Sequence, residues 1–293
     1  MTGVTHECDF PPEANQRPRV TTSYIDSSVS SAEIDRQVTE RFRSGEQLYG
    51  LNEGLLGSDP PDLIVTQDLC PVCAVSPTDF EKHMHAAGCE AGIVTLNPNT
   101  LEDVLESIHI VGEATNRVEQ ALDITTALRE RLDAVQAAVS GQARPRVLTI
   151  EWLEPLMPGG HWMPEMVTIA GGACGLIGPG KPSRKLPWEE MCAENPDVVV
   201  LMPCGFEPGR GAREAEALWR LDGWCELPAV RAGEVYCVDG SAHFSRPGPR
   251  LVDGTEILAR ILHPGAWTQE IGAGAALKLA DMNGARPVFQ EYR

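Results

Sequence analysis

Basic residues are scarce in this chain, which has 24 Lys and Arg against 42 Asp and Glu and a net charge of −18. That charge repels polyanions, so we expect no nucleic-acid partner and no binding to anionic membrane surfaces. No apolar run approaches the roughly 20 residues that a membrane-spanning helix needs. The opening residues, MTGVTHECDFPPE, lack the basic and apolar regions of an export signal. We therefore expect a cytoplasmic protein with no membrane insertion, unless the N-terminus is mis-assigned.

Several catalytic and disulfide patterns are also missing. The nine cysteines are an odd, scattered set without the dense spacing of a small disulfide scaffold, and we interpret most of them as reduced thiols. The motifs G-x-S-x-G, HExxH and the P-loop do not occur. Nothing in the sequence compels catalysis, so we expect a protein that is not an enzyme and has no resident metal.

What the sequence does contain is a repeated alternation of apolar strands and helical patterns, which is typical of parallel α/β layers. The stretches PPDLIVTQDLC (60–70) and NPDVVVLMPC (195–204) share a Pro-Asp turn, an apolar strand and a cysteine after it. Each is followed by a second strand and a helix, so we predict two similar Rossmann-like lobes. The predicted strands are Leu63 to Thr66, Gly92 to Leu96, Arg146 to Ile150, Asp197 to Met202 and Glu234 to Val238.

A long helical pattern lies between the two halves. Thr100 and Asp103 form a capping-box pattern, and a second helix is predicted to start at Asn116 and to stop at Gly141. A helix of that length suits a rigid bridge between lobes, although it also suits one more helix packed on a single sheet. The predicted parts are an N-terminal lobe (1–115), an interlobe helix (116–141), a C-terminal lobe (142–264) and a peripheral tail (265–293).

Aromatic residues gather in the loops that follow the predicted strands. Ligands of parallel sheets bind outside the carboxyl ends of the strands, where loops converge. Rings in such loops indicate an apolar pocket with a few polar groups, or else rings that close the ends of the core. These loops contain the rings of Trp152, His161, Trp162, Phe206, His243 and Phe244, together with Cys204 and Arg246.

The pair Cys70 and Cys73 follows the first predicted strand and has three interpretations. With His85 and Cys89 it has the spacing C-x2-C-x11-H-x3-C, which is close to that of a structural zinc site. A redox couple would need a thioredoxin-like surrounding pattern, which we do not find. We favour small thiols in a turn at the mouth of the first lobe.

The chain also resembles a known family over nearly its whole length, to about Pro264. The resemblance is to the cobalamin-binding branch of the iron-siderophore/cobalamin substrate-binding proteins, in a subgroup without a signal peptide. It is carried by the segments THECDFPPE, PDLIVTQDLCPVCAVS, VTLNPNTLEDVLESIHIVGEAT, EWLEPLMPGGHWMPEMVTIAGG, PWEEM, PDVVVLMPCGF and SAHFSRPGPRLVDGTEILARILHP. It implies two α/β lobes joined by one long helix, with the ligand in a cleft between them. The family's usual first strand and helix have no counterpart before GVTHECD.

The resemblance implies a corrinoid, cobalamin or a relative, as the bound ligand. The first wall would comprise Glu7, Cys8, Gln67, Asp68, Cys70 and Cys73, and the second Trp152, His161, Trp162, Trp188, Cys204, Phe206, His243, Phe244 and Arg246. His161, His6 and His243 are candidate axial ligands of cobalt, because neutral imidazole binds such metals. The alternative role for each is a hydrogen bond to a ligand amide.

We expect delivery, storage or sensing of the corrinoid, with a corrinoid-using enzyme or an ABC transporter permease as partner. Two alternatives stay open. One is the binding subunit of an ABC importer for cobalamin or a ferric siderophore. The other is an enzyme that processes corrinoids with the thiols of Cys70, Cys73 and Cys204.

Overall fold

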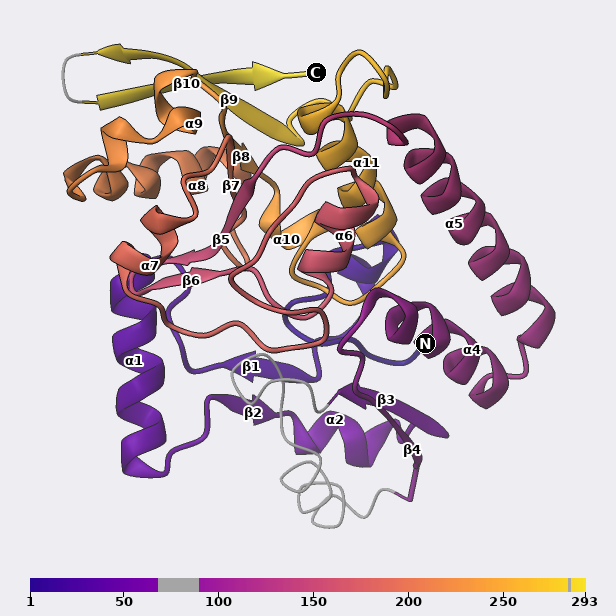
Figure 1. The fold of residues 1–293 in the computed structure, drawn as a ribbon. Helices are drawn as coiled ribbons and strands as arrows, with labels where there is room; N and C mark the ends of the chain where they lie inside the picture. Colours follow the sequence, from indigo (N-terminus) through magenta and orange to yellow (C-terminus); the bar gives the residue numbers. More distant parts are fainter. Residues whose placement is uncertain (68–89, 284–285) are drawn as a thin grey trace. The chain divides into compact units, whose positions relative to one another are not determined.

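The structure is a computed structural model that describes residues 1–67, 90–283 and 286–293 (Figure 1). The chain divides into two compact units. The first comprises Met1–Asn97 and Ile110–Arg117, and the second comprises Pro98–His109 and Val118–Arg293. The predicted Asp68, Cys70, Cys73, His85 and Cys89 lie outside the described residues, so the zinc and redox interpretations stay untested.

The first unit contains two small sheets. Strands β1 (Thr21–Ser23) and β2 (Tyr49–Leu51) pair antiparallel, whereas β3 (Leu63–Gln67) and β4 (Gly92–Leu96) pair parallel. Helix α1 (Ser31–Ser44) begins where the Ser30 hydroxyl accepts a hydrogen bond from the Glu33 N–H, and it ends at Gly45, whose φ of 71° suits glycine. The unit also contains α2 (Glu53–Ser58) and a 3₁₀ helix at Pro12–Gln16.

The second unit is built on a six-stranded mixed sheet with the order β10-β9-β8-β7-β5-β6. Strands β5 (Val147–Leu153), β7 (Val198–Leu201) and β8 (Val235–Val238) are parallel to one another. Strands β6 (Leu156–Pro158), β9 (Ala276–Asn283) and β10 (Arg286–Tyr292) extend the sheet antiparallel. All four residues of both β7 and β8 are buried, as expected for strands covered on both faces.

The structure confirms the strands predicted from apolar runs and the α/β class. The parallel pairs β3–β4 and β7–β8 are the strand pairs of the predicted repeat. Residues 265–293 are more integrated than a peripheral tail, because β9 pairs directly with β8. The position of these strands in the sheet depends on long-range pairing with β8, which a local sequence pattern does not encode.

Helices cover the sheet of the second unit on both faces (Figure 1). On one side a core cluster includes Leu148, Leu201, Met191 and Trp224. Elsewhere α11 packs against α5 and α6. The helices are α5 (Val118–Val139), α6 (Met163–Ile169), α7 (Trp188–Ala193), α8 (Pro208–Glu214), α9 (Pro228–Arg231), α10 (Gly240–His243) and α11 (Arg250–Leu262), with 3₁₀ helices at Ala215–Arg220 and Trp224–Glu226.

The helical stretch between the sheets begins with the predicted capping box. The Thr100 N–H donates to Asp103 Oδ2 at 2.9 Å, and the Asp103 N–H donates to Thr100 Oγ1 at 3.1 Å. Helix α4 (Leu101–Ala114) then ends before Asn116, whose φ of 54° separates it from α5. The predicted restart near Asn116 and the stop at Gly141, with φ of 77°, are confirmed. The interlobe role of the helix stays a prediction. No helix of the described part is long and apolar enough to span a membrane.

Candidate functional site

The candidate site lies at the carboxyl ends of β5, β7 and β8 in the second unit. These strands are parallel, so the loops that follow them leave the same edge of the sheet. The predicted residues Trp152, Cys204 and His243 lie at or just beyond these strand ends. These three residues therefore lie at one edge of the sheet, and their role in binding a ligand stays a prediction.

Three of the predicted ring residues are buried and cannot present a face to a ligand here. Trp162 is 4% exposed, and Phe206 and Phe244 are each 2% exposed. The Trp162 indole N–H donates to the Phe244 carbonyl oxygen at 2.8 Å, which ties together two loops that are 82 residues apart. These rings close the end of the core, which was the alternative interpretation of the aromatic loops.

Trp152 is the predicted indole that stays partly exposed at this edge, whereas Trp162 is buried. Its ring centroid lies 5.6 Å from that of Phe206, in a tilted arrangement. The Arg210 guanidinium stands 3.6 Å from the centroid of the same Phe206 ring. The indole N–H of Trp152 donates to the Glu154 carbonyl oxygen at 3.1 Å, and this bond fixes the orientation of the ring. A partly exposed indole therefore rests on a buried phenyl ring.

His161 is held firmly beside these rings. Its φ is 52°, its N–H donates to the Lys181 carbonyl at 2.6 Å and its carbonyl accepts from the Gly180 N–H at 3.0 Å. The imidazole lies 5.6 Å from the Trp162 ring, and burial lowers its pKa from 6.5. A neutral imidazole at pH 7 can accept a hydrogen bond or bind a metal carried by a ligand.

Glu151 is a polar residue of this edge that the predicted set omits. Its carboxylate accepts a hydrogen bond from the Gly160 N–H at 3.1 Å and another from the Ser183 hydroxyl. Burial raises its pKa above 4.5, against the effect of these two donors. Its position directly after the apolar run VLTI was the available signal, but nothing in the sequence revealed that Ser183 lies near it.

The other predicted residues of this unit lie in different surroundings. Trp188 is the first residue of α7. Its indole N–H donates to the Asp222 carbonyl oxygen at 2.7 Å, and the centroid of its ring lies 5.6 Å from that of Trp224. It thus packs on the core cluster of the sheet face. Cys204 is exposed in the loop after β7, and Arg246 is partly buried between α10 and α11. His243 lines a separate pocket with Asp253.

The predicted residues of the first unit occupy its N-terminal turn and the end of β3. Glu7 is exposed, 3.6 Å from the His6 ring nitrogen Nε2. The Cys8 carbonyl accepts a hydrogen bond from Arg19, and Gln67 is the last residue of β3, opposite Leu96. Their expected place in a wall facing the second unit stays a prediction.

Comparison with known proteins identifies the family. Residues 53–242, more than half of the chain, match the family model described as periplasmic binding protein. The chain belongs to the periplasmic binding protein family. The family match confirms the coarser part of the resemblance, and the cobalamin-specific branch is taken up below.

One relative and several solved structures resemble the chain. The uncharacterized ABC transporter substrate-binding lipoprotein YvrC of Bacillus subtilis is 26% identical over 189 residues, which cover 61% of this chain and 57% of that protein. The chain therefore matches less than two thirds of this relative's length.

Solved structures share the fold. A periplasmic heme-binding protein from Pseudomonas aeruginosa aligns with a TM-score of 0.69 and 19% identity, covering 97% of this chain and 91% of that one. The periplasmic vitamin B12 binding protein BtuF of Vibrio cholerae aligns with a TM-score of 0.59 and 20% identity, covering 89% and 87%. At these identities the likeness shows the fold, and it confirms the predicted two-lobe α/β class.

The predicted cytoplasmic location is wrong. The family is described as periplasmic, and YvrC is described as a lipoprotein of an ABC transporter, which are extracytoplasmic settings. The prediction failed because it relied on thiol content and on the first residues of the chain. Unpaired cysteines alone do not fix the compartment of a protein.

Proposed function

We propose that this protein binds cobalamin or a related corrinoid and presents it to an ABC transporter permease. Three findings support the proposal: the quoted cobalamin-type segments, the family match and the description of YvrC as an ABC transporter substrate-binding lipoprotein. The alignable structures include binders of heme and of vitamin B12, so the fold is compatible with large tetrapyrrole ligands. The proposed role is binding, without chemical conversion of the ligand.

The observation that carries the proposal is the partly exposed Trp152 indole, which packs in a tilted arrangement against the buried Phe206 ring. A corrinoid is a broad and largely apolar ring system with amides at its edge, so it needs a flat apolar contact and hydrogen-bond partners. Trp152 offers the flat contact, and its N–H is already engaged by Glu154. Burying one large apolar side chain stabilises a complex by roughly 1.5–3 kcal/mol before ordering costs. Several such contacts suffice for tight binding.

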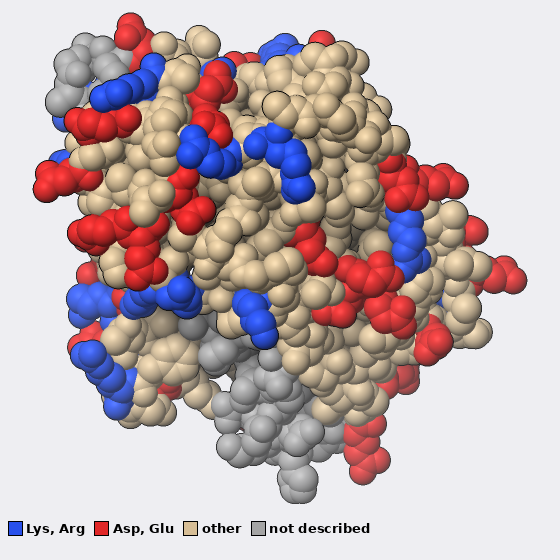
Figure 2. Space-filling model, viewed as in Figure 1, with Lys and Arg blue, Asp and Glu red and all other residues tan. Residues whose placement is uncertain are grey.

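Charge favours a corrinoid over an anionic ferric siderophore. Arg210, the cation on the Phe206 ring, also lies 3.4 Å from the Glu214 carboxylate, so its charge is partly offset. Acidic side chains are spread widely over the face drawn in Figure 2, in keeping with the net charge of −18. An anionic chelate would meet this field unfavourably.

The direct test is a titration of the purified full chain with three ligands, namely aquocobalamin, hemin and a ferric hydroxamate, followed by isothermal calorimetry. We expect the corrinoid to bind tightest. Trp152→Ala should weaken that binding about tenfold or more, the equivalent of one lost ring contact. Trp219→Ala is the matched control, because Trp219 is also partly buried but packs on Trp224 and Phe289. Tighter binding of hemin or of the hydroxamate would replace the corrinoid with that ligand.

The role of His161 is tested by the visible spectrum of bound aquocobalamin. If the His161 imidazole coordinates cobalt, His161→Ala shifts the absorbance of the complex. An unchanged spectrum removes His161 as an axial ligand of cobalt. The walls from the first unit are tested in the same titration with Gln67→Ala.

The competing proposal is thiol-dependent processing of the corrinoid. Of the three cysteines predicted for this role, Cys204 lies among the described residues, and it is exposed. Demethylation of methylcobalamin with added glutathione, abolished by Cys204→Ser, would support it. Binding without such turnover supports the transport role.

A further inference from the structure

Glu151 occupies an irregular position near the carboxyl end of β5. Strands β5 and β6 pair Ile150 with Pro158 and then Trp152 with Met157, so Glu151 is an extra residue in a β-bulge. A bulge removes one residue from the regular pairing and re-aims its side chain, and bulges are common beside functional sites. The strand thus directs Glu151 away from the ladder and toward the loops of the candidate site.

Three loops at this edge of the sheet are bonded to Glu151. Its Oε2 accepts from the Gly160 N–H at 3.1 Å and its Oε1 from the Ser183 hydroxyl, while its carbonyl accepts from the Cys204 N–H at 3.0 Å. Among the described residues, no Lys or Arg pairs with this carboxylate. Removing a carboxylate from water without a cation is unfavourable for folding, and such exceptions are expected at functional sites.

The loops of Gly160 and Ser183 lie in direct backbone contact. A Cβ at Gly160 would lie 2.3 Å from the Ser183 nitrogen and 2.8 Å from the Lys181 carbonyl oxygen, so this approach requires glycine. The next residue, His161, donates its N–H to the same Lys181 carbonyl at 2.6 Å. The carboxylate of Glu151 therefore bridges the two segments that hold His161.

The conformation of His161 depends on such support. Its φ of 52° is uncommon for a residue other than glycine, and it persists only where the surroundings fix it. We propose that Glu151 is the positioning residue of the candidate site, which holds the loop of His161 in the conformation that presents the imidazole to a ligand. It acts through its bonds to Gly160 and Ser183 and not by contact with the ligand.

This inference deepens the proposed function and rests on it for the identity of the ligand. The position of the His161 ring can be measured without any ligand, whereas the corrinoid proposal is tested by binding. The two can therefore fail separately.

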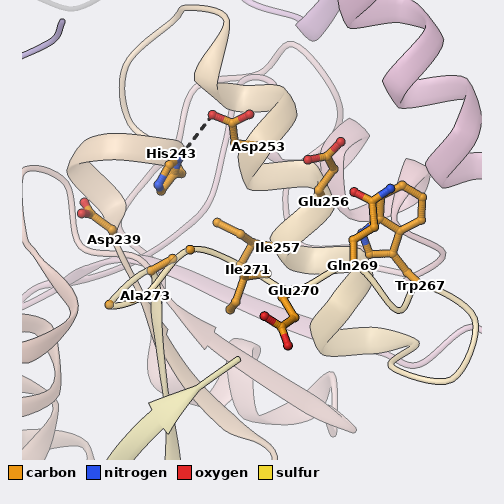
Figure 3. Close-up of a pocket in the computed structure, with 13 residues that line it drawn as sticks. Asp239, His243, Asp253, Glu256, Ile257, Trp267, Gln269, Glu270, Ile271 and Ala273 are labelled. Carbon is orange, nitrogen blue, oxygen red and sulfur yellow. Dashed lines mark ion pairs between the residues drawn. The ribbon is translucent and has the colours of Figure 1, made fainter.

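The ligand-free measurement follows the ring signals of the seven histidines in the ¹³C-labelled full chain. His161→Ala removes one signal and so assigns it. His243 lines a separate pocket beside Trp267 (Figure 3), so its signal is an internal reference that should stay in place.

Two variants of Glu151 separate its hydrogen bonds from its charge. Glu151→Leu removes both side-chain acceptors, so the His161 signal should shift and the pKa of the ring should rise toward 6.5 as the loosened loop exposes the imidazole to water. Glu151→Gln should leave the signal close to that of the wild type. Its amide oxygen can accept from the Gly160 N–H, and its NH₂ group can donate to the Ser183 hydroxyl.

Ser183→Ala removes one of the two bonds and should move the His161 signal in the same direction by a smaller amount. Its matched control is Ser107→Ala, because the Ser107 hydroxyl donates to the Val104 carbonyl within α4 at 2.6 Å and joins no loops. Since Ser183→Ala changes a single hydroxyl group, it carries the test if Glu151→Leu does not fold.

Calorimetry with aquocobalamin connects the position of His161 to binding. Glu151→Leu should weaken binding about tenfold through the loss of two hydrogen bonds, and Ser183→Ala about threefold through the loss of one. Glu151→Gln and Ser107→Ala should leave the affinity within about twofold of the wild type.

Three results would overturn the inference. The first is a His161 signal that stays in place in both Glu151→Leu and Ser183→Ala. The second is an affinity for aquocobalamin that these two variants share with the wild type. The third is an equal loss of affinity in Glu151→Leu and Glu151→Gln, which would show that the charge acts on the ligand directly. If the signal moves but the wild-type chain binds no aquocobalamin, the positioning of His161 by Glu151 is confirmed and the corrinoid proposal fails.

Discussion

The hydrogen bond between the Trp162 indole and the Phe244 carbonyl gives the most decisive stability prediction. Trp162→Phe keeps an aromatic ring but removes the donor of a 2.8 Å bond in a site that is only 4% exposed. Leaving a buried carbonyl without that donor costs about 1–3 kcal/mol. The smaller ring also leaves a void, which adds roughly 1–2 kcal/mol. We therefore expect the free energy of unfolding to fall by about 2–5 kcal/mol.

Tryptophan fluorescence is a clean assay for this prediction, because all six tryptophans belong to the second unit. Urea unfolding followed by fluorescence therefore reports that unit. The matched control is Trp219→Phe, where the ring is partly buried and contacts Trp224 and Phe289, and there we expect a loss below about 1 kcal/mol. A loss for Trp162→Phe no larger than that of the control would refute the structural role of the bond.

Three further predictions concern the second unit. First, burial lowers the pKa of His161 and His243 below 6.5, so the unfolded chain binds more protons than the folded chain on acidification. The free energy of unfolding should therefore fall as the pH drops from about 7 to 5. Urea titrations at each pH should show a flatter slope for the double variant His161→Gln/His243→Gln. Second, Arg131→Gln should lower the free energy of unfolding by only about 1 kcal/mol, because the ion pairs of Arg131, including that with Asp253, are partly exposed and screened. A loss of stability that is unchanged in 1 M salt would contradict this reasoning. Third, Gly254→Ala should cost about 1–3 kcal/mol by thermal unfolding, since a Cβ there would overlap the His243 carbonyl; a neutral result would show that α10 can move away from α11.

Local patterns predicted the regular elements well, for a physical reason. Buried parallel strands such as β7 and β8 are continuous apolar runs, and the Thr100–Asp103 capping box needs only residues three apart. Both signals are carried by short stretches of chain, so the sequence alone reveals them.

Long-range packing decided what the sequence could not show. Whether a strand-end ring is a contact or a support depends on partners such as Trp162 and Phe244, which lie far apart in the chain. The integration of residues 276–292 into the sheet depends on pairing with β8. The cavity beside Trp267 arises only once that segment is folded against α11.

Some strand-end rings are buried and others are partly exposed. Variants of the two kinds should therefore affect the free energy of unfolding and the affinity for a ligand to different extents. Trp162 lies in the core and should affect unfolding with little effect on ligand affinity, whereas Trp152 lies at the surface of the stack and should affect affinity with a smaller effect on unfolding. Since Phe206 supports Trp152 and Trp162 is bonded to the loop of Phe244, some coupling between the two variants is expected. A double variant whose losses in stability add within about 0.5 kcal/mol would show that the two rings contribute independently, whereas a larger deviation would show that their contributions to folding are coupled.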